Sequence, residues 1–97
     1  MEKSIVLSRL SRIRKSLENF RVTSIGLFGS TVREENTKDS DIDIIVDFVE
    51  GKETYRNFLS VYEALQGMFK GSRLDVVTRK GLSPYFGETI LSETQYV

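Results

Sequence analysis

The sequence predicts an α/β fold in which three strands alternate with helices in the order αβαβαβα. Two long segments repeat apolar residues every three or four positions, which is typical of amphipathic helices. Three shorter segments are rich in β-branched and apolar residues, which is typical of strands, and helical segments separate them. At 97 residues, we expect one domain over residues 1–97, without a second substrate-binding domain.

The first helix and the first strand are predicted in residues 5–20 and 22–28. The helix carries an apolar stripe formed by Val6, Leu10, Ile13, Leu17 and Phe20. Arginine and lysine residues fill many of its other positions, and we interpret this basic stripe as a solvated face without a function. The strand stops at Gly29 and Ser30, a glycine followed by a residue that commonly begins helices.

The second strand, Ile42 to Val49, is predicted to be the central one. A short helix from Thr31 to Glu35 and a polar loop that reaches Ser40 precede it. Apolar residues are nearly continuous along this strand, so we expect it to be the most buried of the three.

The second half of the chain contains two further helices around a third strand. A helix follows Gly51, and we assign its apolar and aromatic row to the core: Tyr55, Phe58, Leu59, Tyr62, Leu65 and Phe69. The third strand is predicted at Leu74 to Thr78, after Gly71. Ser83 and Pro84 are expected to begin a last helix that carries Phe86, Ile90, Leu91 and Val97.

Composition excludes several classes of chemistry. The sequence has no cysteine and no histidine, so disulfides, thiolate zinc sites and histidine bases are absent. Fourteen basic and fourteen acidic residues balance, so we expect no direct binding to nucleic acid and no attraction to an anionic membrane. The first residues lack the apolar run of a signal peptide, which leads us to expect a cytoplasmic protein.

Three aspartates are the candidate metal ligands. Asp41 and Asp43 stand two apart at the start of the central strand, so both carboxylates are expected on one face. Such pairs are also common at strand ends without any function. Asp75 interrupts an apolar strand and could simply pair with Arg73 or Arg79. If its strand lies beside the central one, however, three carboxylates could together hold two Mg²⁺ ions.

The segment after the first strand is a candidate anion site. Gly29 would let the backbone approach a phosphate, and the helix that follows would offer free N–H groups. The simpler explanation is a strand-to-helix turn in which Ser30 is the N-cap. Arg33 lies one turn further along and could contact a phosphate with two hydrogen bonds, although an exposed arginine is the ordinary case.

These motifs resemble those of a known family. Gly29-Ser30, nine residues, Ser40-Asp41-Ile42-Asp43 and the later Asp75-Val76-Val77 are similar to the nucleotidyltransferase superfamily that includes DNA polymerase beta. The length resembles its minimal members, the MNT proteins of HEPN/MNT toxin–antitoxin pairs. The resemblance implies a nucleotidyltransferase fold with a small three-stranded mixed sheet flanked by helices, and it extends to the final helix with Ile90, Glu93 and Val97.

The resemblance also implies roles and partners. Asp41, Asp43 and Asp75 would bind two Mg²⁺ ions and act in catalysis, with Asp75 helping to activate the attacking hydroxyl. The NTP, most simply ATP, would be bound by Gly29, Ser30, Arg33 and Ser40. The expected acceptor is a tyrosine of a HEPN-family toxin encoded alongside, which AMP would modify, and the chain would be its antitoxin. An oligomer with itself or with that partner is compatible with the sequence.

One departure from the family leaves alternatives open. The family commonly has glycine after Arg33, where this chain has Glu34. An acid near a triphosphate would weaken nucleotide binding unless its side chain points to solvent. One alternative is therefore a non-catalytic antitoxin that neutralises its partner by binding. Another is the catalytic subunit of a small-molecule nucleotidyltransferase of the antibiotic-modifying type.

Overall fold

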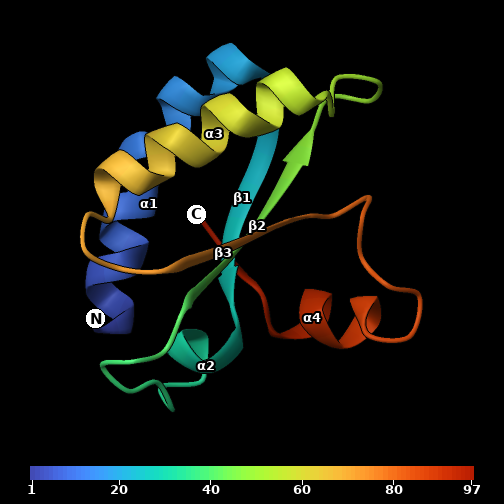
Figure 1. The fold of residues 1–97 in the computed structure, drawn as a ribbon. Helices are drawn as coiled ribbons and strands as arrows, with labels where there is room; N and C mark the ends of the chain where they lie inside the picture. The colour runs from blue at the N-terminus through green and yellow to red at the C-terminus, as the bar shows by residue number, and fades with distance from the viewer.

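A computed structural model describes all residues 1–97 and confirms the α/β class (Figure 1). The elements are α1 (Lys3–Leu17), a 3-10 turn η1 (Glu18–Phe20), β1 (Val22–Phe28), α2 (Gly29–Val32), β2 (Ile42–Phe48), α3 (Tyr55–Met68), β3 (Leu74–Thr78), α4 (Gly87–Glu93) and β4 (Gln95–Tyr96). No helix combines the length and the apolar character needed to cross a membrane.

The strands form one mixed sheet in the order β3-β2-β1-β4. β1 and β2 are antiparallel, with Leu27 opposite Ile44, whereas β2 and β3 are parallel, with Asp43 opposite Asp75. β2 is therefore a central strand, as the sequence predicted. The prediction of three strands was wrong by one, because residues 95–96 add a short antiparallel strand beside β1.

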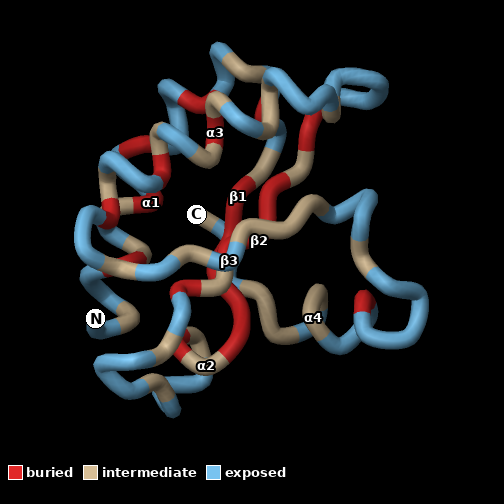
Figure 2. Tube along the Cα trace, in the orientation of Figure 1, coloured by how far each residue is buried: buried red, intermediate tan, exposed pale blue.

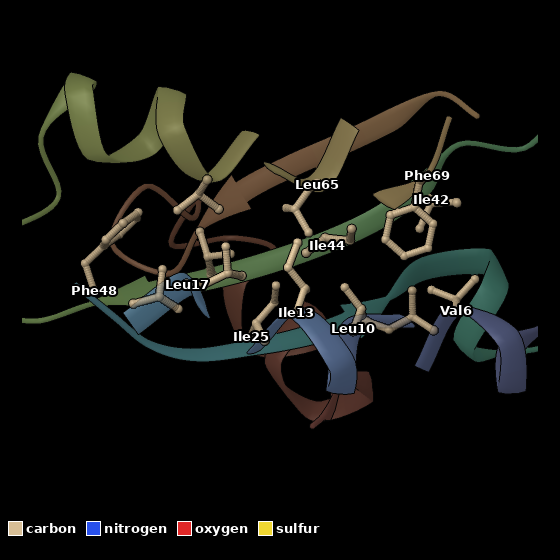
Figure 3. Close-up of a cluster of buried hydrophobic side chains, with 14 residues drawn as sticks. Val6, Leu10, Ile13, Leu17, Ile25, Ile42, Ile44, Phe48, Leu65 and Phe69 are labelled. Atoms are coloured by element: carbon tan, nitrogen blue, oxygen red, sulfur yellow. The ribbon is translucent and has the colours of Figure 1, made fainter. Parts of the chain in front are cut away.

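The hydrophobic core lies between the sheet and the two long helices, α1 and α3, which cover the same face (Figures 1 and 3). In Figure 2 the buried positions concentrate along β1, β2 and the inner sides of these helices. The residues that fill the core include Val6, Leu10, Ile13 and Leu17 of α1, Val61 and Leu65 of α3, and Ile25, Leu27, Ile42, Ile44, Val46 and Phe48 of the sheet.

Side-chain alternation along β2 separates core from candidate site. Ile42, Ile44, Val46 and Phe48 belong to the core cluster. Because successive side chains of a strand point to opposite faces, Asp43 points away from α1 and α3. The parallel register puts Asp75 beside Asp43 on the same face. The carboxylates are thus placed on the face that the long helices leave uncovered.

The two shorter helices differ from the predictions. α2 begins at Gly29, not Thr31, so Ser30 lies inside the helix and is not its N-cap. α4 begins at Gly87, because the Ser83 hydroxyl accepts a hydrogen bond from the N–H of Tyr85 and closes a turn there instead. Val97 lies beyond α4, and its N–H donates to the Ile25 carbonyl at 3.1 Å.

The row on α3 is only partly in the core, and this corrects the prediction. Leu65 and Phe69 are fully buried, but Tyr55 is 79% exposed and Leu59 is 39% exposed. β2 also ends at Phe48, which leaves Val49 largely exposed. β3 is an edge strand without a fully buried residue, so Asp75 is an exposed acid at the sheet edge and not an acid in a buried strand.

Two leucines of α3 test this description of the core. Leu65→Ala should lower the free energy of unfolding by about 2–5 kcal/mol, because a fully buried side chain leaves a cavity. Leu59→Ala, on the more exposed side of the same helix, should cost less than about 1 kcal/mol. Urea unfolding followed by circular dichroism measures both, and equal losses would contradict the placement of α3.

Candidate functional site

The site is built around two acids on adjacent parallel strands. Asp43 is the second residue of β2 and Asp75 the second residue of β3, and the register places them directly opposite each other. Half-burial of Asp43 and the nearby charges of Asp75 and Asp41 raise the pKa of Asp43 from 3.8 to about 6. An excess of negative charge is therefore concentrated at this point of the sheet.

Asp41 stands one residue before β2 and is neutralised by an arginine. The Arg73 Nε atom lies 3.1 Å from Asp41 Oδ1, and its Nη2 donates to the Asp39 carbonyl at 2.5 Å. In this conformation no three acidic side chains lie close enough together to hold one metal ion. The structure thus brings Asp43 and Asp75 together, while Asp41 is turned toward Arg73.

Neither arginine considered as a partner of Asp75 pairs with it. Arg73 pairs with Asp41, and Arg79 Nη1 lies 3.8 Å from Asp47 Oδ2 at the other end of β2. The ordinary explanation of Asp75, an ion pair with one of these two residues, is therefore wrong.

Gly29 is required by its contact with Asp43. Its φ of +76° lies in the left-handed region, which favours glycine. A Cβ atom at this position would also collide with the Asp43 carboxylate. We expected this glycine to make room for a phosphate, but in the structure the Asp43 side chain lies in the space beside it.

Arg33 lies beside this glycine and is held by two glutamates. Its Nε donates to Glu35 at 2.7 Å and its Nη1 donates to Glu93 at 2.8 Å, and these two hydrogen bonds raise the pKa of Arg33. The second carboxylate oxygen of Glu93 accepts from the Gly29 N–H at 3.0 Å. These contacts of Glu93 could not be predicted from the sequence, since 60 residues separate it from Arg33. Its only signal was the resemblance of the C-terminal ending to the family.

The remaining candidates lie around this centre. Ser30 follows Gly29 and is partly buried. The Ser40 hydroxyl accepts from the Thr37 N–H at 2.9 Å, and Ser40 borders a hollow of about 500 Å³ that Lys38 and Arg73 also line.

Glu34 has a φ of +59°, in the left-handed region that favours glycine. This conformation explains why the family commonly has glycine after the arginine. Its side chain is exposed and borders a different hollow, of about 420 Å³, beside the start of α1. Asp41, Asp43 and Asp75 do not line that hollow. The location of its side chain indicates that Glu34 points to solvent and does not face a triphosphate bound at the three aspartates.

The fold and its paired acids define a class of protein. The family model described as a nucleotidyltransferase domain matches residues 7–97, and the chain belongs to this family. Protein adenylyltransferase MntA of Thermococcus cleftensis is 41% identical over 91 residues, which cover 93% of this chain and 90% of that protein.

Solved structures agree with this assignment. A structure described as a candidate minimal nucleotidyltransferase matches with a TM-score of 0.82 and 30% identity, over 98% of this chain and 95% of that one. A crystal structure of the toxin–antitoxin pair MntA–HpeT matches with a TM-score of 0.67 over 89% of this chain and 69% of that one. At 19% identity, this second likeness concerns the fold alone. The chain is thus a nucleotidyltransferase, as its motifs indicated.

Replacement of Gly29 by alanine tests the contact with Asp43. Any residue other than glycine at this φ costs about 1–2 kcal/mol, and the collision should add a further ~1–3 kcal/mol. Gly71→Ala is the matched control, because Gly71 has a φ of +84° but nothing within 4 Å of its missing Cβ. Urea unfolding should show a larger loss for Gly29→Ala, and equal losses would show that backbone conformation alone requires the glycine.

The raised pKa of Asp43 predicts a pH-dependent effect on stability. An acid whose pKa is higher in the folded than in the unfolded chain destabilises the fold as pH rises from 3.8 through about 6. Asp43→Asn should therefore raise the free energy of unfolding above pH 6, by about 1 kcal/mol after allowance for solvent screening. The gain should vanish below pH 3.8.

Urea unfolding at several pH values, in the presence of a chelator, measures this gain. Asp39→Asn, which removes an exposed carboxylate of the preceding loop, serves as the control and should show no comparable dependence. A gain for Asp43→Asn that stays constant from low to neutral pH would contradict the charge repulsion.

Proposed function

We propose that this nucleotidyltransferase transfers AMP from ATP to a hydroxyl group of a partner protein, and that it is the antitoxin of a HEPN-family toxin. The observation that carries the proposal is the pair Asp43 and Asp75, held side by side on an open face next to Gly29. Similarity to a protein adenylyltransferase supports AMP as the transferred group and a protein as the acceptor. The family resemblance supports a tyrosine of a HEPN toxin as the target.

The acids fit magnesium by their chemistry. Asp43 and Asp75 offer the carboxylate oxygens that Mg²⁺ prefers. Burial, and then the charges of Asp75 and Asp41, raise the pKa of Asp43, and a divalent cation would neutralise those charges. Asp41 would become a third ligand once its carboxylate leaves Arg73. Two Mg²⁺ ions bound by these residues would neutralise triphosphate charge and make the acceptor hydroxyl more acidic.

The residues of the chain then have separate tasks in the transfer. Arg33, Ser30 and Ser40 orient the triphosphate, and Asp75 accepts the proton of the attacking hydroxyl. The hydroxyl oxygen bonds to the α-phosphorus as the bond to the oxygen that bridges the α- and β-phosphates breaks, and pyrophosphate leaves. Such a reaction depends mainly on positioning and on charge compensation, so it needs no histidine.

The openness of the site supports an acceptor that belongs to another protein. Asp41 and Asp75 are exposed, and neither Asp43 nor Asp75 lines any of the surface hollows. The chain therefore provides no enclosed pocket for a small acceptor beside its acids. A partner that docks on this face would bring its own hydroxyl to them, and proximity of this kind supplies much of the rate.

Intact-mass spectrometry tests the proposal. The protein mixed with its HEPN partner, ATP and Mg²⁺ should add one or more AMP units to the partner, and peptide mapping should locate them on tyrosine. The double variant Asp41→Asn/Asp43→Asn should add none while it keeps its fold, because removal of like charges does not weaken the core. If this variant neutralises the toxin as well as the wild type, and neither protein adds mass, the chain is a non-catalytic antitoxin.

A further inference from the structure

Arg33 is held by two carboxylates that differ in how firmly they are fixed. We propose that Glu93 is a positioning residue, which holds Arg33 and Gly29 in the arrangement that binds a nucleotide, and that Glu35 is a displaceable partner whose place the phosphates take. This inference rests on the proposed function, in which Arg33 orients the triphosphate of ATP.

Glu93 bridges two groups of the site with one carboxylate. Its Oε1 accepts from the Gly29 N–H at 3.0 Å, and its Oε2 accepts from Arg33 Nη1 at 2.8 Å. Its side chain is only 22% exposed. The backbone on either side is also held, because Glu93 ends α4 and β4 pairs with β1 two residues later. Glu93 therefore fixes Arg33 relative to the sheet.

Glu35 has none of this support for its side chain. It lies in the loop after α2, is 62% exposed, and contacts Arg33 through Nε alone at 2.7 Å. Exposed ion pairs of this kind contribute little to stability, because solvent screens them. A triphosphate carries more negative charge than one carboxylate and accepts hydrogen bonds from guanidinium groups in the same planar geometry. Phosphate oxygens can thus replace Glu35 at little cost.

An arginine that is fixed on one side binds an anion better than a free one. A free arginine side chain loses rotamer entropy when it is immobilised. The hydrogen bond to Glu93 already restricts Arg33 before the nucleotide binds, so less side-chain entropy is lost on binding. This is preorganisation, and it increases affinity. The same carboxylate satisfies the Gly29 N–H, so it also holds the segment that lies against Asp43.

The two glutamates should therefore have opposite effects on ATP affinity. Glu35→Gln should tighten the binding of Mg²⁺–ATP by about two- to fivefold, because a competing charge is removed, and the gain should shrink at high salt. Glu93→Gln should weaken binding by about three- to tenfold, because one charge-assisted bond of the anchor is lost. Isothermal titration calorimetry measures both dissociation constants.

The sign of the Glu93 effect decides the proposal. Both substitutions remove one negative charge near the nucleotide, so electrostatics alone would tighten binding in both variants. If Glu93→Gln tightens binding, Glu93 is a second competitor and the proposal is wrong. In an Arg33→Gln background the effect of Glu93→Gln should largely disappear. An undiminished effect in that background would show that Glu93 acts on the fold and not through Arg33.

A matched control is available at the other end of the sheet. Glu53 pairs with Lys80 at 2.7 Å and is 24% exposed, close to the values for Glu93 and Arg33. Glu53→Gln should leave ATP affinity unchanged, and urea unfolding of every variant confirms that each is folded at the titration temperature. The proposed function is tested separately by Asp43→Asn. If the wild type binds ATP, Asp43→Asn abolishes that binding and Glu93→Gln tightens it, this inference alone is overturned. If the wild type binds no ATP, both the inference and the proposed function are overturned.

Discussion

The parallel pairing of β2 with β3 is the constraint on which the candidate site depends. It sets Asp75 directly opposite Asp43, and two carboxylates at that spacing repel each other. Alternation along β2 turns Ile42, Ile44, Val46 and Phe48 to the other face, where α1 and α3 cover them. Burial of the core face thus stabilises a strand pairing that brings like charges together on the opposite face.

Positive charge is distributed unevenly among the acids around the site. Asp41 has Arg73, and Glu93 has both Arg33 and the Gly29 N–H. Asp43 has no comparable partner, and its burial together with the charges of Asp75 and Asp41 raises its pKa to about 6. The uncompensated charge is therefore confined to the centre of the site. This is the place where a cation or the metal-bound phosphates of a nucleotide would gain the most electrostatic energy.

The C-terminal segment connects this centre to the rest of the fold. α4 supplies Glu93, β4 pairs with β1, and the Val97 carbonyl accepts from Arg14 Nε of α1 at 3.0 Å. Arg9 likewise donates to the Met68 carbonyl at 3.2 Å, so two arginines of the basic stripe hold neighbouring elements. Through the contact between Arg14 and Val97, the C-terminal segment joins the open face of the sheet to α1, which covers the other face.

The sequence alone determined the features that depend on local patterns. β-Branched and apolar content located β1 and β3 at their observed bounds, and helical periodicity located α1 and α3. The spacing of the motifs indicated the nucleotidyltransferase fold. The start of α4 was predicted wrongly, because Ser83 and Pro84 are equally suited to a turn.

Only the tertiary structure decided which charges meet. The partners Arg33 and Glu93 are 60 residues apart, and Arg73 and Asp41 precede two different strands. β4 exists because two residues reach the free edge of β1. The collision that requires glycine at position 29 likewise depends on β2 lying beside β1. Such contacts follow from packing of the whole chain, and no periodicity within a short segment encodes them.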